Sequence, residues 1–274
     1  MKSVKFTYTT LFSDLDTQKH VNSNKYFDLF ESGKYLLLAK QGITKEFLLK
    51  NDYKLIPVQT NFKFAKQIVE NETIEVRITL SIMLNGYLKW NCEIENNKSI
   101  CFKISSINWV KRELLDFIDL RREIQPFNLK PLDFRDILCN TFSSSFDLRN
   151  IERNYFGGIA ENITWKLFEE TRWQHSNLLN IDLDFLRGLD IAFFWREGEY
   201  QYLNPINPVD SLKIKIWFEK ITEVKLVYAL EMVNQENQVI CKSISDFISV
   251  SQSKRKIKRI PKELIDCVQN YIKN

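Results

Sequence analysis

Residues 42–64 read GITKEFLLKNDYKLIPVQTNFKF, and residues 180–202, which lie 180 − 42 = 138 positions further along, read NIDLDFLRGLDIAFFWREGEYQY. The same offset also matches residues before and after these two stretches. The matched pairs include Ile43 and Ile181, Phe47 and Phe185, Leu48 and Leu186, Asp52 and Asp190, Phe30-Glu31 and Phe168-Glu169, Ile78 and Ile216, and Glu93 and Glu231. One constant offset over so much of the chain indicates a duplicated domain.

Hydrophobic periodicity predicts the same order of elements in each copy. In the first copy, residues 5–13 alternate as a strand, and residues 24–40 place apolar side chains at helical spacing. Further strands are predicted at 55–65, 72–84, 87–95 and 99–110; the second copy has a helix at 162–178 and strands at 191–203, 211–219, 223–233 and 239–250. A sheet with one buried face needs an apolar helix to cover it. We therefore expect an α+β fold with two antiparallel sheets, each wrapped around a long central helix.

The repeat also sets the expected domain organisation. We predict a first domain over residues 1–112, a connector over 113–143, a second domain over 144–252 and a basic tail over 253–274. The tail carries six cations between Ser253 and Lys262. A solvated terminal extension would explain these charges. Alternatively, they attract the phosphates of a ligand or the acidic surface of a partner protein.

Composition excludes several classes of protein. The 39 Lys and Arg residues against 35 Asp and Glu residues leave a net charge of +4, too small for an obligate nucleic-acid binder. The 7 glycines form neither GxGxxG nor GxxxxGK[ST], which excludes the common dinucleotide and phosphate-loop motifs. Two histidines and five scattered cysteines offer no close set of zinc ligands. We expect no metal and no cofactor.

The cysteines and apolar runs bear on location. The cysteine count is odd and no CxxC occurs, which favours buried thiols in a reducing compartment such as the cytoplasm. No apolar run approaches the ~18 residues needed to span a bilayer, and the first residues lack the apolar core of a secretion signal. A cytoplasmic protein without a membrane span is the expectation.

Polar side chains are densest between the first predicted strand and the long helix, in the stretch SDLDTQKHVNSNKY from Ser13 to Tyr26. Asp16, Gln18, His20 and Asn22 recur at every second position, so an extended loop directs them to one side. Asn22, Ser23 or Asn24 is suited to cap the helix, whose free N–H groups can stabilise an oxyanion. A carboxylate base beside such a site suits hydrolysis of an acyl compound.

The stretch SDLDTQKHVNSNKYFDLFES resembles the DxDxNxHVNNxKY signature of hotdog-fold acyl-acyl-carrier-protein thioesterases and, more broadly, the 4-hydroxybenzoyl-CoA thioesterase-like group. The order of strand, helix and four strands in both copies is similar to that fold. The resemblance implies a double hotdog that forms an intrachain pseudo-dimer. It implies hydrolysis of a fatty or related acyl thioester, of acyl carrier protein or coenzyme A, to the free acid and a thiol.

The resemblance also implies roles for individual residues. Asp16 would be the general base or the nucleophile, and His20 would be its polarising partner. Gln18 and Asn22 complete the implied catalytic set, while Ser23, Asn24 and Tyr26 are implied to bind substrate. Gln18 replaces the family's asparagine, and Ala65 stands where the family has a further glutamate. The motif lies in the first copy, whereas the plant enzymes carry it in the second.

The second copy lacks the motif. The offset of 138 aligns Asp16 with Asn154 and His20 with Gly158, and no DxD occurs there. The helix stretch WKLFEETRW at Trp165–Trp173 nevertheless resembles a family helix containing FEEAR. Since hotdog sites form where two units meet, the resemblance implies one active site per chain. The chain is then a monomer or a homodimer.

Simpler interpretations stand beside these. Asp16 could cap a turn, Asp14 could support the loop, and Tyr26 could pack the helix against its sheet. His20 and His175 could be structural. A hotdog hydratase or dehydratase, or a non-catalytic acyl-binding protein, would use the same fold.

Overall fold

The computed structural model describes residues 2–83, 86–118, 127–134, 139–148, 161–207 and 210–273. The chain divides into two compact units. The first contains Met1–Lys130 and Asn154–Asn162, and the second contains Pro131–Arg153 and Ile163–Asn274. Within the described residues, no helix is both long and apolar enough to cross a lipid bilayer.

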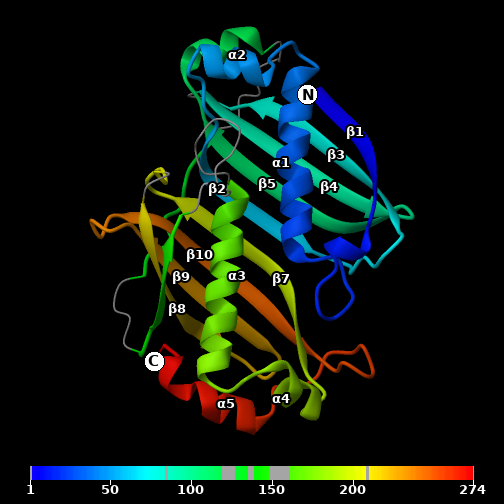
Figure 1. The fold of residues 1–274 in the computed structure, drawn as a ribbon, viewed down its shortest axis with the longest axis vertical. Helices are drawn as coiled ribbons and strands as arrows, with labels where there is room; N and C mark the ends of the chain where they lie inside the picture. The colour runs from blue at the N-terminus through cyan, green and yellow to red at the C-terminus, as the bar shows by residue number, and fades with distance from the viewer. Residues whose placement is uncertain are drawn as a thin grey trace. The chain divides into compact units, whose positions relative to one another are not determined.

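The first unit contains five antiparallel strands in the order β1-β3-β4-β5-β2, with the long helix α1 lying across them (Figure 1). Its elements are β1 (Lys2–Thr9), the 3-10 turn η1 (Phe12–Asp14), α1 (Ser23–Ala39), α2 (Lys45–Lys50), β2 (Ile56–Phe64), β3 (Thr73–Ile82), β4 (Tyr87–Asn96), β5 (Ser99–Trp109) and η3 (Arg112–Phe117).

Aromatic packing attaches α1 to its sheet. Phe27 is fully buried, with its ring centroid 5.3 Å from that of Phe62 on β2 and 5.5 Å from that of Phe102 on β5, both edge to face. Further along the helix, a Cβ added to Gly33 would lie only 2.4 Å from Cγ1 of Ile78 on β3. The absence of a side chain at Gly33 therefore lets the helix backbone approach the strand closely.

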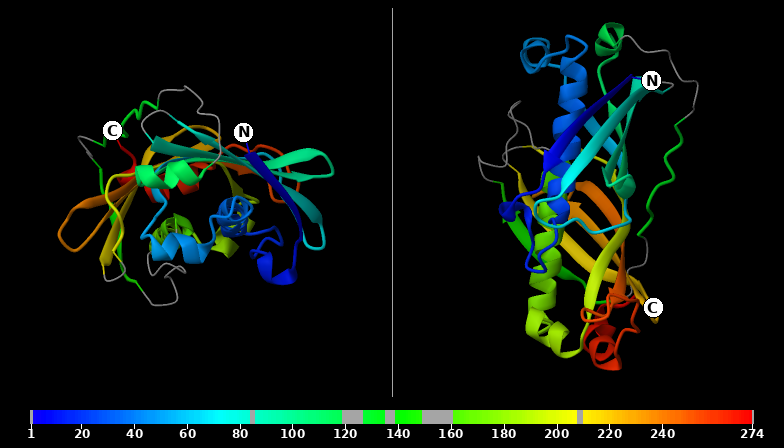
Figure 2. Two further views of the ribbon diagram at one scale, coloured as in Figure 1. Left: turned by 90° about the horizontal axis from the view of Figure 1, so that it is seen from above. Right: turned by 90° about the vertical axis from the view of Figure 1, so that its right-hand side faces the viewer.

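The second unit repeats this plan with strands in the order β7-β10-β9-β8-β6. Figure 2 shows, within each unit, the long helix on one face of its strands. The elements are β6 (Phe142–Asp147), α3 (Glu161–Leu178), α4 (Leu183–Gly188), β7 (Ala192–Tyr202), β8 (Ser211–Ile221), β9 (Lys225–Val233), β10 (Val239–Val250), α5 (Lys262–Val268) and η5 (Gln269–Tyr271). Phe168 on α3 stacks on Tyr200 of β7, at 5.4 Å between centroids, so α3 packs on its own sheet as α1 does.

An aspartate after each short helix ties the turn to the end of the sheet, an arrangement we call the clasp. Asp52 and Asp190 both have left-handed backbone conformations, with φ of 48° and 52°. Asp52 binds Lys111 just beyond β5, with 3.1 Å between Nζ and Oδ2. Asp190 accepts a hydrogen bond of 2.6 Å from the Ser251 hydroxyl just beyond β10. The repeat thus extends from sequence to backbone conformation and contacts.

The structure confirms both long helices and the eight strands that follow them, each ending within two residues of its prediction. The strand predicted at 5–13 was wrong at both ends, since β1 spans Lys2–Thr9. The chain then turns into η1 because the Asp14 carboxylate accepts the Leu11 N–H, at 2.9 Å. The short helices α2 and α4, and strand β6, were not predicted.

The proposed connector and tail are parts of the units. Phe134, within the predicted connector 113–143, packs edge to face on Trp217 of β8 at 5.1 Å between centroids. In the tail 253–274, Leu264 and Val268 of α5 are buried. The first unit ends at Lys130 and takes up the chain again at Asn154–Asn162.

His175 on α3 lies in an aromatic pocket of the second unit. Its ring is fully buried, with centroids 4.6 Å from Tyr271 and 5.3 Å from Phe142. Neither ring nitrogen has a hydrogen-bond partner among the described residues. Burial lowers the pKa of His175 to about 4, because a charged imidazolium is poorly solvated there.

This burial predicts acid sensitivity. The folded pKa of His175 lies below the unfolded value, so the unfolded chain binds more protons between pH ~6.5 and ~4. The free energy of unfolding should therefore fall by about 3 kcal/mol as the pH is lowered through this range. His175→Phe should remove that part of the loss, measured by urea denaturation at a series of pH values. Both proteins share the losses due to carboxylates, so the difference between their curves isolates His175. Parallel curves would contradict the prediction.

Candidate functional site

The motif predicted to carry the chemistry forms a tight loop between η1 and α1. Leu15 and Val21 form an antiparallel bridge, and the Asp16 N–H donates to the His20 carbonyl, at 2.7 Å. Lys19 adopts a left-handed conformation, with φ of 64°. The bridge brings Asp16 and His20 to the base of one hairpin, next to the start of the helix.

Asp16 organises this hairpin through its side chain. Its Oδ1 accepts the Gln18 N–H at 2.8 Å and the His20 N–H at 3.1 Å. Both of these hydrogen bonds reach Oδ1, and no hydrogen bond to Oδ2 is found among the described residues. Capping of the turn therefore uses Oδ1 of Asp16, and Oδ2 can take part in a reaction.

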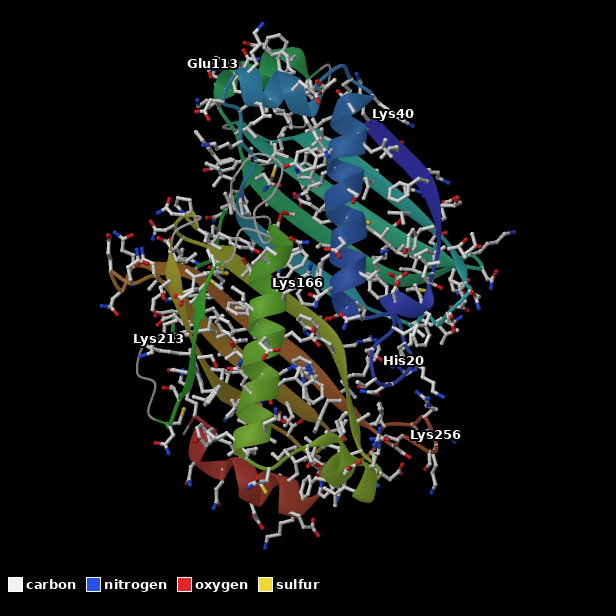
Figure 3. All side chains as sticks on the ribbon, viewed as in Figure 1. His20, Lys40, Glu113, Lys166, Lys213 and Lys256 are labelled. Carbon is white, nitrogen blue, oxygen red and sulfur yellow. The ribbon has the colours of Figure 1, made fainter. Side chains whose placement is uncertain are left out.

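The remaining loop residues differ in exposure. His20 is only 8% exposed, whereas the Gln18 side chain is exposed. Figure 3 shows His20 on the loop at the N-terminal end of α1. The backbone of His20 is held by Asp16 on both its N–H and its carbonyl.

The N-terminus of α1 is capped by Asn22. Its Oδ1 accepts the Asn24 N–H at 2.9 Å, and its own N–H donates to the Asp14 carbonyl at 2.7 Å. This cap uses the side chain of Asn22 for the helix itself. The Asn24 side-chain oxygen is buried without a partner among the described residues. Buried acceptors are usually satisfied, so Asn24 Oδ1 has unused capacity to accept a hydrogen bond.

Tyr26 belongs to the core. It is 3% exposed, and its ring centroid lies 5.2 Å from those of Phe64 and Phe102. Burial raises the pKa of its hydroxyl above the ordinary value, and a hydrogen bond donated by the Ile68 backbone N–H opposes the shift. These contacts support the packing interpretation of Tyr26 rather than substrate binding.

Asp14 holds the loop to the sheet. Its Oδ2 accepts the Tyr8 hydroxyl at 2.7 Å, and its Oδ1 lies 3.1 Å from Nζ of Lys25 on α1. Burial by itself would raise the pKa of Asp14, but hydrogen bonds from Leu11, Tyr8 and Lys25 hold it below the ordinary value. Asp14 thus connects β1, η1 and α1, which supports its predicted role as the residue that supports the loop.

The remaining positions compared with the family motif are not part of the hairpin. Ala65, in place of the family's glutamate, is an exposed residue just after β2. The second-copy positions Asn154 and Gly158 lie outside the described residues. No group of three or more metal-ligating side chains is close enough to hold an ion in the part of the chain that the structure describes.

Some cations of the basic tail are bound within the second unit, and others are exposed. Lys258 donates to the Leu189 carbonyl at 2.7 Å, and Arg259 pairs with Glu223 at 2.9 Å. These two side chains tie the tail to its own unit. Lys254 and Lys256 are exposed on the hairpin after β10, where Figure 3 marks Lys256.

Comparison with known proteins establishes the fold. No protein-family model matches the sequence, and no curated protein matches it significantly. A solved structure described as an oleoyl thioesterase from Lactobacillus plantarum matches with a TM-score of 0.76 over 91% of this chain and 97% of that one, at 9% identity. The chain has the double-hotdog fold.

Two further structures match the double hotdog over nearly their whole length. The 12:0-ACP thioesterase from Umbellularia californica has a TM-score of 0.70 over 90% of this chain and 94% of its own, at 9% identity. An acyl-ACP thioesterase from Bacteroides thetaiotaomicron has a TM-score of 0.64 over 89% and 97%, also at 9% identity. Likeness at this identity concerns the fold, so the chemistry has to be argued from the loop.

The contacts of Asp14 predict that it matters more for stability than Asp16 does. Asp14→Asn removes the negative charge beside the partly buried Lys25, and the free energy of unfolding should fall by about 1–3 kcal/mol at pH 7. Asp16→Asn keeps an oxygen for the two N–H groups, so its effect should be below about 1 kcal/mol.

Urea denaturation of both variants checks this difference. Because the folded pKa of Asp14 is lowered, its contribution is present above pH ~4 and is lost as pH falls through the folded pKa. Equal stability of Asp14→Asn and the wild type at pH 7 would refute the role given to Asp14.

Proposed function

We propose that this double hotdog is an acyl thioesterase, which hydrolyses a fatty or related acyl thioester to the free acid and a thiol. The observation that carries the proposal is the Asp16 carboxylate, held by its own hairpin beside the N-terminus of α1, with Oδ2 left for chemistry. The matching folds of thioesterases over both copies support it.

In the proposed reaction, Asp16 either takes a proton from the attacking water or attacks the thioester carbonyl itself. The positive end of the helix dipole at the start of α1, near Ser23, stabilises the oxyanion that forms. The leaving thiol has a pKa near ~8.5, so the thiolate departs without strong protonation. His20 polarises the reacting groups, and Gln18 supplies an amide from the exposed side of the loop. The reaction needs no cofactor.

The substrate is proposed to be a thioester of acyl carrier protein or coenzyme A. Both carry the acyl group on an arm that contains amide N–H groups, and Asn24 Oδ1 is a buried acceptor able to receive one. The intrachain pseudo-dimer, the monomeric or homodimeric state and the cytoplasmic location remain predictions from the sequence.

Replacement of Asp16 tests the proposal. Asp16→Asn should lower kcat/KM by about 10²–10⁴-fold while the protein stays folded, because the amide is neither a base nor a nucleophile. Thiol release is followed with a panel of acyl-carrier-protein and acyl-CoA substrates, and circular dichroism checks the fold. Asp184→Asn, at an exposed residue of α4, is the matched control and should leave activity unchanged.

Three outcomes of that panel are informative. A fully active Asp16→Asn variant would contradict the assignment. Hydration of enoyl thioesters by the wild type without thiol release would indicate a hydratase. Binding of acyl thioesters without turnover would indicate an acyl-binding protein.

The exposed tail lysines make a separate prediction about substrate capture. Lys254→Gln with Lys256→Gln should raise KM by about tenfold at low ionic strength and leave kcat unchanged, because the lysines attract an anionic substrate. The control variant, Lys213→Gln with Lys220→Gln, removes the same number of charges from two exposed lysines of β8. Unchanged KM and salt dependence in the tail variant would reject this role.

A further inference from the structure

A charged cluster is buried in the first unit, away from the hairpin of Asp16. Lys34, in the second half of α1, is 1% exposed, and its Nζ lies 2.6 Å from Oε2 of Glu31 and 3.1 Å from Oε2 of Glu161. Glu161, the first residue of α3, is 6% exposed. A buried ammonium between two carboxylates is costly to desolvate, so its polar neighbours determine whether it is stable.

Two hydroxyl groups complete the surroundings of the Glu161 carboxylate. Thr60 of β2 donates to Oε1, and the Ser106 hydroxyl of β5 lies 3.2 Å from Oε1 and 3.4 Å from Oε2. Thr60 and Ser106 are both fully buried. The carboxylate therefore receives one ammonium and two hydroxyl donors from α1 and the sheet. We call Lys34, Thr60 and Ser106 the cradle.

The repeat shows what Glu161 replaces. Since 23 + 138 = 161, Glu161 corresponds to Ser23, and these are the first residues of α3 and α1. In the first copy, that position opens the helix end proposed to receive the thioester carbonyl. In the second copy, the same position carries Glu161, whose carboxylate is bound by the cradle.

The second unit retains only part of the cradle. Lys34 corresponds to Arg172, whose guanidinium lies 3.3 Å from Glu169, so both long helices have an acid–base pair three residues apart. Thr60 pairs with Ser106 across the sheet, whereas the corresponding Gly198 pairs with Ser245. The Ser245 hydroxyl is buried without a partner among the described residues. The full set of donors thus occurs where Glu161 is present.

We propose that the cradle is a binding site for a carboxylate and that the chain fills it with its own Glu161. The site selects a planar, singly charged carboxylate, since an ammonium and two hydroxyls face its two oxygens. Removing the side chain beyond Cβ deletes a two-carbon acid, and acetate has that size and charge. Acetate should therefore bind to the cradle of a Glu161→Ala variant.

Thermal unfolding at pH 7 tests the proposal, with total ionic strength held constant by chloride. Glu161→Ala should lower Tm by about 10 °C, because the two hydroxyls lose their acceptor and the buried Lys34 keeps only one carboxylate partner, Glu31. Acetate at about 100 mM should restore several degrees in a saturable manner. Acetamide, which has the same shape without the charge, should restore nothing.

Two variants serve as matched controls. Glu161→Gln fills the space, so acetate should not raise its Tm. Lys34→Gln in the Glu161→Ala background removes the charge of the cradle, and the response to acetate should disappear. An equal acetate response in the wild type, Glu161→Ala and Glu161→Gln would overturn the proposal, as would equal rescue by acetamide.

A variant that does not fold in chloride still decides the question. The yield of Glu161→Ala refolded from urea should then be higher in acetate than in chloride, and equal yields would overturn the proposal. These measurements do not use thioester hydrolysis, so they stand or fall independently of the proposed function.

Discussion

Burial of α1 against its own sheet is the constraint on which the first unit depends. The aromatic contacts of Phe27 with Phe62 and Phe102, and the close approach of Gly33 to Ile78 further along the helix, hold α1 against the strands at two points. A helix held in this way has a defined N-terminus. The loop that precedes it can then place polar groups reproducibly, which is the requirement for a site built on a rigid element.

Support of the loop and chemistry on the loop are divided between two aspartates. Asp14 is buried and uses both carboxylate oxygens for contacts with β1, η1 and α1. Asp16 is less buried and uses one oxygen for the turn. Alternate residues of an extended chain point to the same side, so the DxD spacing alone would place both aspartates together. The turn η1 ends at Asp14 and breaks that alternation, which leaves Asp14 buried and Asp16 in the hairpin that follows. Their environments, rather than their chemistry, distinguish the two roles.

Local pattern predicted much of this structure, and long-range contact accounts for what it missed. The face of α1 and the alternation of the strands are local signals, and the elements predicted from them were correct. The repeat is read by comparing the sequence with itself, which also needs no knowledge of the fold. Strand β6 reads FSSSFD, and its run of serines has little β-strand character. Tyr26 resembles a ligand residue in the motif, but the fold buries it. Glu161 resembles an ordinary acidic residue in a first helical turn, and only the folded chain brings it to Lys34, 127 residues away.

The clasps of Asp52 and Asp190 carry a consequence for ancestry. A left-handed aspartate that binds the segment beyond the last strand occurs at the same place in both copies, so it is most simply inherited from a chain that existed before duplication. The DxD motif of the Asp16 loop and the glutamate at position 161 each occur in the sequence of one copy alone. They record divergence after duplication, when one copy kept the reactive loop and the other was free to change. The clasp is thus the older feature, and the asymmetry of the two helix ends is the younger one.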